Sequence, residues 1–228
     1  MRVALLSDVH SNVHALRAVL DDIDRVAPDE IAFLGDAVGY NAHPGECLEL
    51  LRERCGAMVL GNHDEAVVEG GEELFTAAAR AGVEHSRDRL DAEAMAFLRE
   101  VPRQTEIDGI HLVHGSPRGP TTEYVFPDTH PESLQQIVDH PSVGDAALVA
   151  MGHTHVPFVR DIDGLTVLNV GSVGQPRDGD PRPCWALVDT DGPEVEIRRV
   201  EYDIEAAVAD VRKADLPART ATRLYEGR

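Results

Sequence analysis

The chain has 228 residues, of which 43% are hydrophobic and 27% are charged. This length and apolar content predict a single folded domain, residues 1–228, with a substantial core, and they exclude an intrinsically disordered chain. The formal net charge of -20 argues against binding to nucleic-acid polymers, because an acidic surface repels phosphate backbones.

The first third of the chain alternates short apolar runs with a helical pattern. The apolar runs at 3–6, 31–34 and 58–60 predict buried strands. Between the first two, Leu16, Val19, Leu20 and Ile23 follow the i, i+3, i+4, i+7 spacing of an amphipathic helix. A second helix is predicted over Pro44–Arg54. This alternation is typical of parallel βαβ units.

The middle of the chain differs in composition and in its pattern of apolar residues. Residues 72–100 are rich in alanine and charged residues and show no strand pattern, so we predict one or two helices there. We expect this segment to form a cap over the ends of the sheet.

Beyond Pro102 the pattern changes to strands, at 110–113, 148–151, 156–160, 165–169, 185–188 and 195–200. The Asp-Gly pairs at 163–164 and 191–192 are hairpin signals between the later runs. A last helix is predicted from Asp203 to near Pro217. Together the two halves predict an α+β domain in which sheet packs on sheet with helices outside.

Five of the predicted strands end in the same way, with polar side chains just beyond the last apolar residue. These side chains are Asp8 and His10, Asp36, Asn62, His114, and His153 with His155. Taken alone, an Asp-x-His after a strand is more often a capped loop than a metal site. Ligands of open sheets collect outside the carboxyl ends of strands, so the five junctions together predict one shared site.

The residue types at these junctions define the chemistry. They offer two carboxylates, four imidazoles and one amide, which is too many ligands for one tetrahedral ion but suits two ions that share a bridge. Nitrogen and oxygen ligands without thiolate favour manganese, iron, zinc, cobalt or nickel over calcium or magnesium. Two such ions would make a positive centre in a negative protein and attract an anionic ester.

These motifs resemble the signature of the calcineurin-like metallophosphoesterases. The matching elements are Asp8-x-His10, Gly35-Asp36, Gly61-Asn62-His63-Asp64, His114 in VHGSP, and Gly152-His153-Thr154-His155. The segments SDVHSNVHAL, GDAVGY and NVGSVGQPRDGDPR are further similar to the small single-domain prokaryotic branch, so the likeness covers essentially the whole chain. Val170 stands where that branch usually has proline. The resemblance implies a four-layer α/β-type sandwich of two mixed sheets packed face to face between helices.

The resemblance also implies a role for each ligand. Asp36 would bridge two divalent metal ions, with manganese expected first and iron, nickel, cobalt or zinc as alternatives. The first ion would be held by Asp8, His10 and His155, and the second by Asn62, His114 and His153. A hydroxide bound by both ions would then attack phosphorus in line.

Two residues beside the ligands are candidate catalytic groups. His63 is expected to donate a proton to the leaving oxygen, or alternatively to stabilise the loop. Asp64 is expected to accept a hydrogen bond from the other ring nitrogen of His63 and to keep the imidazole oriented. Arg177 is a candidate for holding a phosphate oxygen, or for bracing its loop.

Six other histidines match no motif position and are interpreted as surface or packing residues. They are His14, His43, His85, His111, His130 and His140.

The expected activity is hydrolysis of phosphate esters, with phosphodiesters preferred. His63 supplies an acid for the leaving group, and no second arginine pair for a dianionic monoester is evident in the sequence. The alternatives are a phosphomonoesterase, acting on proteins or nucleotides, and a non-catalytic scaffold of the same fold. Residues 72–100 and 124–131 are expected to shape specificity, and the sequence leaves room for a homo-oligomer.

The balance of acidic and basic residues indicates the salt concentration in which the protein works. Lys213 is the one lysine among 21 basic residues, against 41 acidic residues. Such a surface is typical of adaptation to high salt, where charge repulsion is screened, although an acidic protein from a high-GC genome is the alternative.

The cysteines and the apolar runs bear on the compartment. Cys47, Cys55 and Cys184 are odd in number and widely spaced, which favours neither a disulfide framework nor a thiolate zinc site. No apolar run approaches the roughly 18 residues that span a bilayer, and the run before Asp8 is too short for a signal-peptide core. We therefore expect a cytoplasmic protein without membrane insertion.

Overall fold

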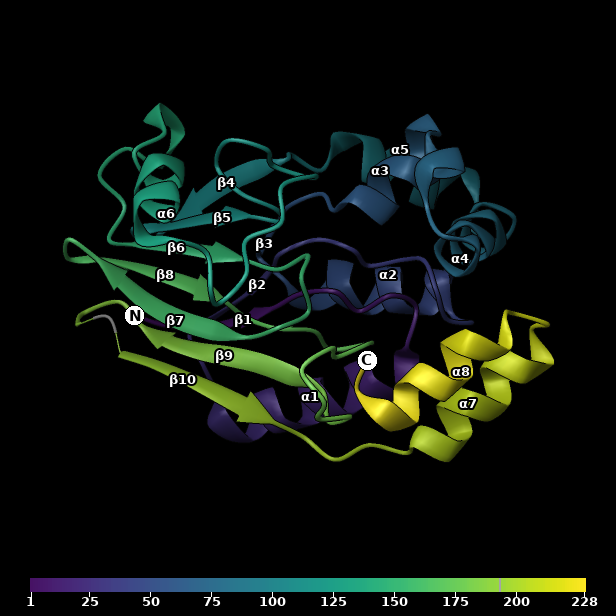
Figure 1. The fold of residues 1–228 in the computed structure, drawn as a ribbon. Coiled ribbons are helices and arrows are strands. Elements are labelled where there is room, and N and C mark those ends of the chain that lie inside the picture. Colours follow the sequence, from purple (N-terminus) through teal and green to yellow (C-terminus); the bar gives the residue numbers. More distant parts are fainter. Residues whose placement is uncertain (193) are drawn as a thin grey trace.

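The structure is a computed structural model that describes residues 1–192 and 194–228. It contains two mixed sheets of five strands each (Figure 1). One sheet, in the order β10-β9-β1-β2-β3, is formed by β1 (Arg2–Leu6), β2 (Glu30–Phe33), β3 (Ala57–Met58), β9 (Cys184–Asp189) and β10 (Glu194–Arg199). The other, in the order β4-β5-β6-β8-β7, is formed by β4 (Gln104–Ile107), β5 (Ile110–Val113), β6 (Leu148–Met151), β7 (Phe158–Ile162) and β8 (Leu165–Asn169).

Each sheet has a parallel part and antiparallel edges. Strands β1, β2 and β3 run parallel, and β9 and β10 add antiparallel strands beside β1. In the second sheet β5, β6 and β8 run parallel, while β4 and β7 are antiparallel to their neighbours.

The helices lie outside the two sheets (Figure 1). They are α1 (Val13–Val26), α2 (Pro44–Arg54), α3 (Asn62–Glu69), α4 (Ala77–Arg87), α5 (Ala92–Glu100), α6 (Pro131–Val138), α7 (Ile204–Lys213) and α8 (Ala218–Glu226), with short 3-10 turns at Glu72–Leu74 and Pro141–Val143. None of the helices in the described part of the chain has both the length and the apolar character that a bilayer-spanning helix requires.

Alternate side chains of β1 point to opposite faces of its sheet and belong to two layers of the core. Val3 and Leu5 point into the space between the sheets, where Leu112 and Leu168 of the second sheet meet them. The alternate residues of β1, including Leu6, pack against the outer helices. A separate apolar cluster joins α6 to the outer face of the second sheet. The predicted arrangement of two mixed sheets packed face to face, with helices on both outer faces, is therefore confirmed.

The predicted elements differ from the observed ones mainly where the apolar signal is weak. Strand β4 was not predicted, because its sequence QTEI alternates polar residues at an edge of the sheet. The strand expected at 156–160 begins at Phe158, since Pro157 has no N–H to pair with a neighbouring strand. Of the run at 58–60, only Met58 lies in a strand, the two-residue β3 (Ala57–Met58).

The C-terminal tail also differs from the prediction. We expected one helix that ends near Pro217, but α7 ends at Lys213 and Pro217 is the N-cap of a further helix, α8. Proline suits the start of a helix, where the N–H that it lacks would have no partner. Helices α7 and α8 pack on each other as a hairpin next to α1 (Figure 1).

The segment 72–100 forms α4 and α5 after a short 3-10 turn. Helix α4 braces the loop that follows β2, because Gly39 N–H donates to Ser86 Oγ at 3.1 Å. A Cβ atom on Gly82 of this helix would lie 2.0 Å from Tyr40 N, so the glycine permits the close approach. This segment therefore supports a loop of the functional site.

Candidate metal centre

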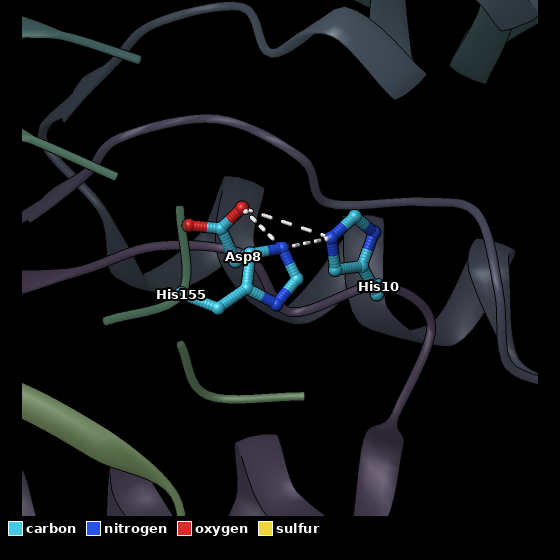
Figure 2. A group of neighbouring side chains, drawn as sticks. All are labelled: Asp8, His10 and His155. Atoms are coloured by element: carbon cyan, nitrogen blue, oxygen red, sulfur yellow. Dashed lines mark hydrogen bonds and ion pairs between the residues drawn. The ribbon is translucent and has the colours of Figure 1, made fainter. Parts of the chain in front are cut away.

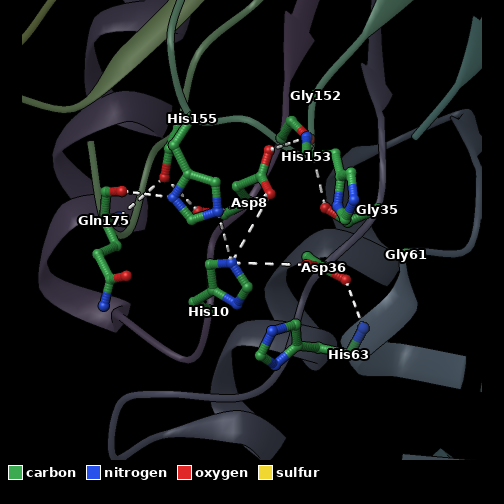
Figure 3. A network of polar contacts seen from close by, with 12 residues as sticks. Asp8, His10, Gly35, Asp36, Gly61, His63, Gly152, His153, His155 and Gln175 are labelled. Atoms are coloured by element: carbon green, nitrogen blue, oxygen red, sulfur yellow. Dashed lines mark hydrogen bonds and ion pairs between the residues drawn. The ribbon is translucent and has the colours of Figure 1, made fainter. Parts of the chain in front are cut away.

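The loops after β1, β2, β3 and β6 meet in one place (Figure 3), and the loop after β5 joins them, because His114 Nε2 contacts His153 Nδ1. Backbone hydrogen bonds join them, from Asp8 N–H to Gly35 O at 2.9 Å and from Gly152 N–H to His114 O at 2.9 Å. A Cβ atom on Gly61 would lie 2.1 Å from Asp36 Oδ1, so only glycine allows the β3 loop to come this close. The convergence predicted from the strand ends is thus present in the structure.

Five of the predicted ligands have left-handed backbone conformations. The φ angles are +54° at Asp8, +47° at His10, +61° at Asp36, +65° at His153 and +61° at His155. Such conformations cost non-glycine residues about 1–3 kcal/mol each and persist where the surrounding structure imposes them, often at functional sites. Here the strain turns these side chains toward one place.

Asp8, His10 and His155 form the first cluster (Figure 2). The Nε2 atoms of the two imidazoles are 3.1 Å apart, and His155 Nε2 lies 3.2 Å from Asp8 Oδ1. His10 Nε2 lies 3.7 Å from the same carboxylate oxygen. All three side chains are buried. They are the set that the resemblance assigns to the first ion.

The second cluster surrounds His114. Its Nε2 atom lies 3.1 Å from His153 Nδ1 and 3.2 Å from Asn62 Oδ1. Asp36, His114 and His153 offer donor atoms within 4.8 Å of one another. The structure therefore brings together the residues expected around the second ion.

Asp36 lies between the two clusters. Its Oδ2 atom is 3.5 Å from His10 Nε2 and 3.4 Å from His114 Nε2. Its Oδ1 atom accepts a hydrogen bond from His63 N–H at 2.8 Å, which fixes the carboxylate. The position is the one that a bridging ligand requires.

Backbone carbonyls orient three of the imidazoles. The Nδ1 atoms of His10, His114 and His155 contact Val38 O at 3.0 Å, Leu34 O at 2.8 Å and Gln175 O, respectively. A carbonyl can only accept, so each Nδ1 carries a proton and each Nε2 is directed to the centre, where a metal ion would take the place of any second proton. This hydrogen bonding selects the tautomer that binds a metal.

Two buried polar atoms bear on whether metal ions fit among these residues. Asp8 Oδ1 and His153 Nε2 are buried, and neither has a hydrogen-bond partner in the described part of the chain. A buried carboxylate oxygen without a partner is costly, and a cation held beside it removes that cost. Together with the convergent lone pairs, Asp8 Oδ1 shows that the donor set fits divalent ions.

The pKa values follow from burial and from neighbouring charges. Burial alone would raise the pKa of the Asp8 and Asp36 carboxyls, but the adjacent imidazoles hold both pKa values well below the usual range. For His114, burial is outweighed by Asp36, which raises the pKa to about 9. Burial lowers the pKa of His153 to about 3 and that of His155 to about 4, which keeps these rings neutral, as metal binding requires.

The expected hydrogen bond between His63 and Asp64 is wrong. Asp64 instead accepts backbone N–H groups, from Asp36 at 2.8 Å, Val38 at 3.1 Å and Gly61 at 3.2 Å. Adjacent residues of a helix do not face each other, and these two residues lie in the first turn of α3. Asp64 thus ties together the loops that carry Asp36 and Asn62.

His63 lies at the edge of the centre. Its ring centroid is 4.7 Å from that of His10, and it also packs against Tyr40 and Phe75. A Cβ atom on Gly39 would lie 2.4 Å from His63 Nδ1, so this nitrogen faces backbone. Burial holds the pKa of His63 well below its usual value.

Arg177 lies beside the first cluster, and a second arginine that the sequence did not reveal lies next to it. Arg177 Nη2 donates to Tyr40 OH at 3.2 Å and to Gln175 Oε1 at 3.1 Å. Arg223 of α8 donates to the same Gln175 oxygen at 3.3 Å. The sequence showed no arginine pair for a dianionic monoester, whereas the structure places Arg223 next to Arg177 on α8, a helix that was not predicted.

The loop before α6 brings aromatic rings to the centre. The ring centroid of Tyr124 is 3.9 Å from that of His153, and Phe126 stacks on Tyr124 at 6.0 Å with an interplanar angle of 7°. Tyr124 is 54% exposed and Phe126 is 44% exposed. The stack leads from a ligand histidine to solvent, within the 124–131 segment expected to shape specificity.

Known proteins resemble this chain in sequence and in fold. The model of the calcineurin-like phosphoesterase superfamily domain matches residues 1–192. An uncharacterized protein of Methanocaldococcus jannaschii is 37% identical over 248 residues, which cover 99% of this chain and 98% of that protein. The crystal structure of a metallophosphoesterase from Sphaerobacter thermophilus is 36% identical, with a TM-score of 0.86, and the match covers 100% of this chain and 99% of that one.

A hypothetical protein from Pyrococcus horikoshii has the same fold, with a TM-score of 0.90 at 23% identity over 100% of this chain and 98% of that one. The structural matches include α7 and α8, which lie beyond the region of the domain model. Because the domain model spans most of the chain and a relative matches nearly all of it, the chain belongs to the calcineurin-like phosphoesterase superfamily.

Proposed function

We propose that the protein is a phosphodiesterase that works with two divalent ions, manganese foremost. The observation that carries this proposal is the place of Asp36, whose Oδ2 atom lies 3.5 Å from His10 Nε2 and 3.4 Å from His114 Nε2. One ion would be held by Asp8, His10 and His155, the other by Asn62, His114 and His153, and both by Asp36. When bound, such ions lower the pKa of the attacking water and neutralise charge on the ester oxygens.

His63 is the group that we assign to the leaving oxygen. It is 5% exposed and lies next to His10 at the edge of the ligand set. Because Nδ1 faces Gly39, Nε2 is the ring nitrogen available to a substrate. A proton or hydrogen bond from this atom would stabilise the charge that develops on the leaving group.

The preference for diesters is supported by the aromatic stack. A diester carries a second organic group that stays on phosphorus, and this group needs a surface beside the metals. Tyr124 and Phe126 offer flat, half-exposed rings next to His153. A planar substituent stacked on such rings gains about 1–3 kcal/mol.

A phosphomonoesterase is the second candidate, and the arginine pair favours it. Arg177 and Arg223 both reach Gln175 Oε1, and their Nε atoms have no partner in the described part of the chain. Two guanidinium groups side by side suit a dianionic phosphate, which a monoester presents at neutral pH.

Hydrolysis of bis(p-nitrophenyl) phosphate and p-nitrophenyl phosphate with manganese distinguishes the two. We expect a higher kcat/KM for the diester and a loss of about tenfold for it in Tyr124→Ala, since one stacking contact is removed. Arg223→Ala leaves the Tyr124–Phe126 stack in place and should leave diester hydrolysis within about twofold of wild type. A preference for the monoester that Arg223→Ala abolishes would assign the second function instead.

We further propose a cytoplasmic, salt-adapted protein. Cys47 and Cys184 are buried free thiols, which fits a reducing compartment. With 41 acidic residues against 21 basic ones, raising sodium chloride from about 0.1 M to about 1 M should screen repulsion and raise the Tm. An unchanged or lower Tm in calorimetry would contradict salt adaptation.

A further inference from the structure

Three side chains of metal-binding type also meet outside the centre described above. His14 comes from the first turn of α1, His43 is the N-cap residue of α2, and Asp210 lies on α7. His14 Nε2 and His43 Nε2 each lie 2.8 Å from the same oxygen, Asp210 Oδ2. This cluster could not be predicted from the sequence, because its three residues are far apart in the chain and match no motif.

The cluster is open to solvent on one side. The exposed fractions of the side chains are 26% for His14, 35% for His43 and 29% for Asp210. His43 and Asp210 also line a surface pocket of about 410 Å³. An ion can therefore reach the three donor atoms, and water can complete its coordination.

The donor set selects a class of ion. Two imidazoles and one carboxylate are ligands for zinc and its neighbours in the first transition row, and three protein ligands plus water make a common tetrahedral site. Bonds of about 2.0–2.1 Å would place neighbouring ligand atoms about 3.3 Å apart. The 2.8 Å contacts to Asp210 would thus open by about half an ångström when an ion enters between them.

We propose that His14, His43 and Asp210 form a third divalent-metal site, of the zinc class, separate from the paired centre. An ion there links α1, α2 and α7 at one point. Since α7 packs on α8, which carries Arg223, the ion fastens the C-terminal hairpin to the helix that follows the Asp8–His10 loop.

A different role for the same residues is a hydrogen-bonded triad. In that case both Nε2 atoms carry protons and donate to Asp210, and no ion binds. Lys213 and Arg89 line the same pocket and would then supply the positive charge near Asp210. The two roles differ in metal uptake, which can be measured.

The test is the zinc content of the full chain. Wild type, His14→Ala, His43→Ala and the control His140→Ala are dialysed against buffered micromolar zinc, and bound metal is counted by mass spectrometry. His140 is a matched control because it is also half-buried and, among side chains of the described residues, hydrogen-bonds only to Ser142. We expect His14→Ala and His43→Ala each to bind one ion per chain fewer than wild type and than His140→Ala.

Equal zinc content in wild type and in both cluster variants would overturn the proposal, as would the same loss in His140→Ala. Thermal unfolding gives a second readout, since zinc that binds the folded chain raises the Tm. In the Asp36→Asn background, which weakens the paired centre, added zinc should still raise the Tm, and His43→Ala should abolish that rise. Diester hydrolysis by His43→Ala should stay within about twofold of wild type, so failure of this site and failure of the phosphodiesterase assignment are distinguishable.

Discussion

The buried centre and the His14–His43–Asp210 cluster use similar side chains in opposite settings. Six of the seven proposed ligands of the centre are buried, with Asn62 half-buried, and Asp8 Oδ1 has no hydrogen-bond partner in the described part of the chain. In the surface cluster Asp210 is satisfied by two imidazoles without any ion. The difference indicates that the centre depends on metal ions, whereas the cluster tolerates their loss.

The backbone separates the two regions as well. In the centre, left-handed backbone conformations and carbonyl contacts to Nδ1 hold six of the seven proposed ligands, all except Asn62. The cluster is assembled from three helices whose relative positions set the distances. We therefore expect high affinity at the centre and weaker, faster exchange at the cluster.

The largest effect is expected for Asp36→Asn. The loss of a shared charge should remove both ions of the centre together and lower diester hydrolysis by about 10³-fold or more, since the ions supply several kcal/mol. Metal analysis of the purified variant checks this, with His140→Ala as the control. Full retention of one ion at the centre would contradict the bridging role.

His63→Ala should lower turnover by about 10²-fold for alkyl leaving groups and much less for p-nitrophenolate, which leaves without a proton. The bound metal should be unchanged, because His63 belongs to neither proposed ligand set. Rates across diesters of graded leaving-group pKa check the role. An equal loss for every leaving group would rule out help to the leaving oxygen.

Gly61→Ala tests the close packing around Asp36. Its Cβ would lie 2.1 Å from Asp36 Oδ1 and 2.2 Å from Asp36 N, so the loop must shift. We expect about 1–3 kcal/mol of destabilisation and metal affinity lowered by about 10–100-fold. The control is Gly45→Ala, where a Cβ meets nothing within 4 Å and the Tm should be unchanged or higher. Equal affinity in both variants would show that the close approach does not matter.

The smallest expected effect is a difference in how fast a chelator removes zinc from the surface cluster and from the buried centre. Zinc-loaded protein treated with a chelator should lose about one ion per chain quickly, from the exposed cluster, and the others slowly. His43→Ala should lack the fast phase, and stopped-flow absorbance of a chromogenic chelator measures it. A fast phase that survives His43→Ala would place the exchangeable ion elsewhere.

Sequence reasoning could predict the centre because its ligands follow apolar strands within short motifs. Asp8, His10 and Asp36 each lie within four residues of a strand end, and parallel strands bring such ends together. Contacts that depend on how helices pack against each other leave no comparable pattern in the sequence. Asp210 and Arg223 lie on surface helices of the tail, and their partners are fixed by how the hairpin packs on α1.

Asp64 shows a second reason why sequence reasoning can fail. Its neighbour in sequence was chosen as its partner, whereas its carboxylate lies against the N–H groups of Asp36 and Val38, about 26–28 residues away. The direction in which a side chain leaves a helix start depends on a loop that the pattern of residue types does not describe.

The most direct measurement is anomalous X-ray diffraction from crystals grown with manganese. We predict two manganese peaks on either side of the Asp36 carboxylate, one contacted by Asp8, His10 and His155 and the other by Asn62, His114 and His153. A single peak that Asp36 does not contact, or no peak among these seven side chains at saturating manganese, would contradict a paired metal centre.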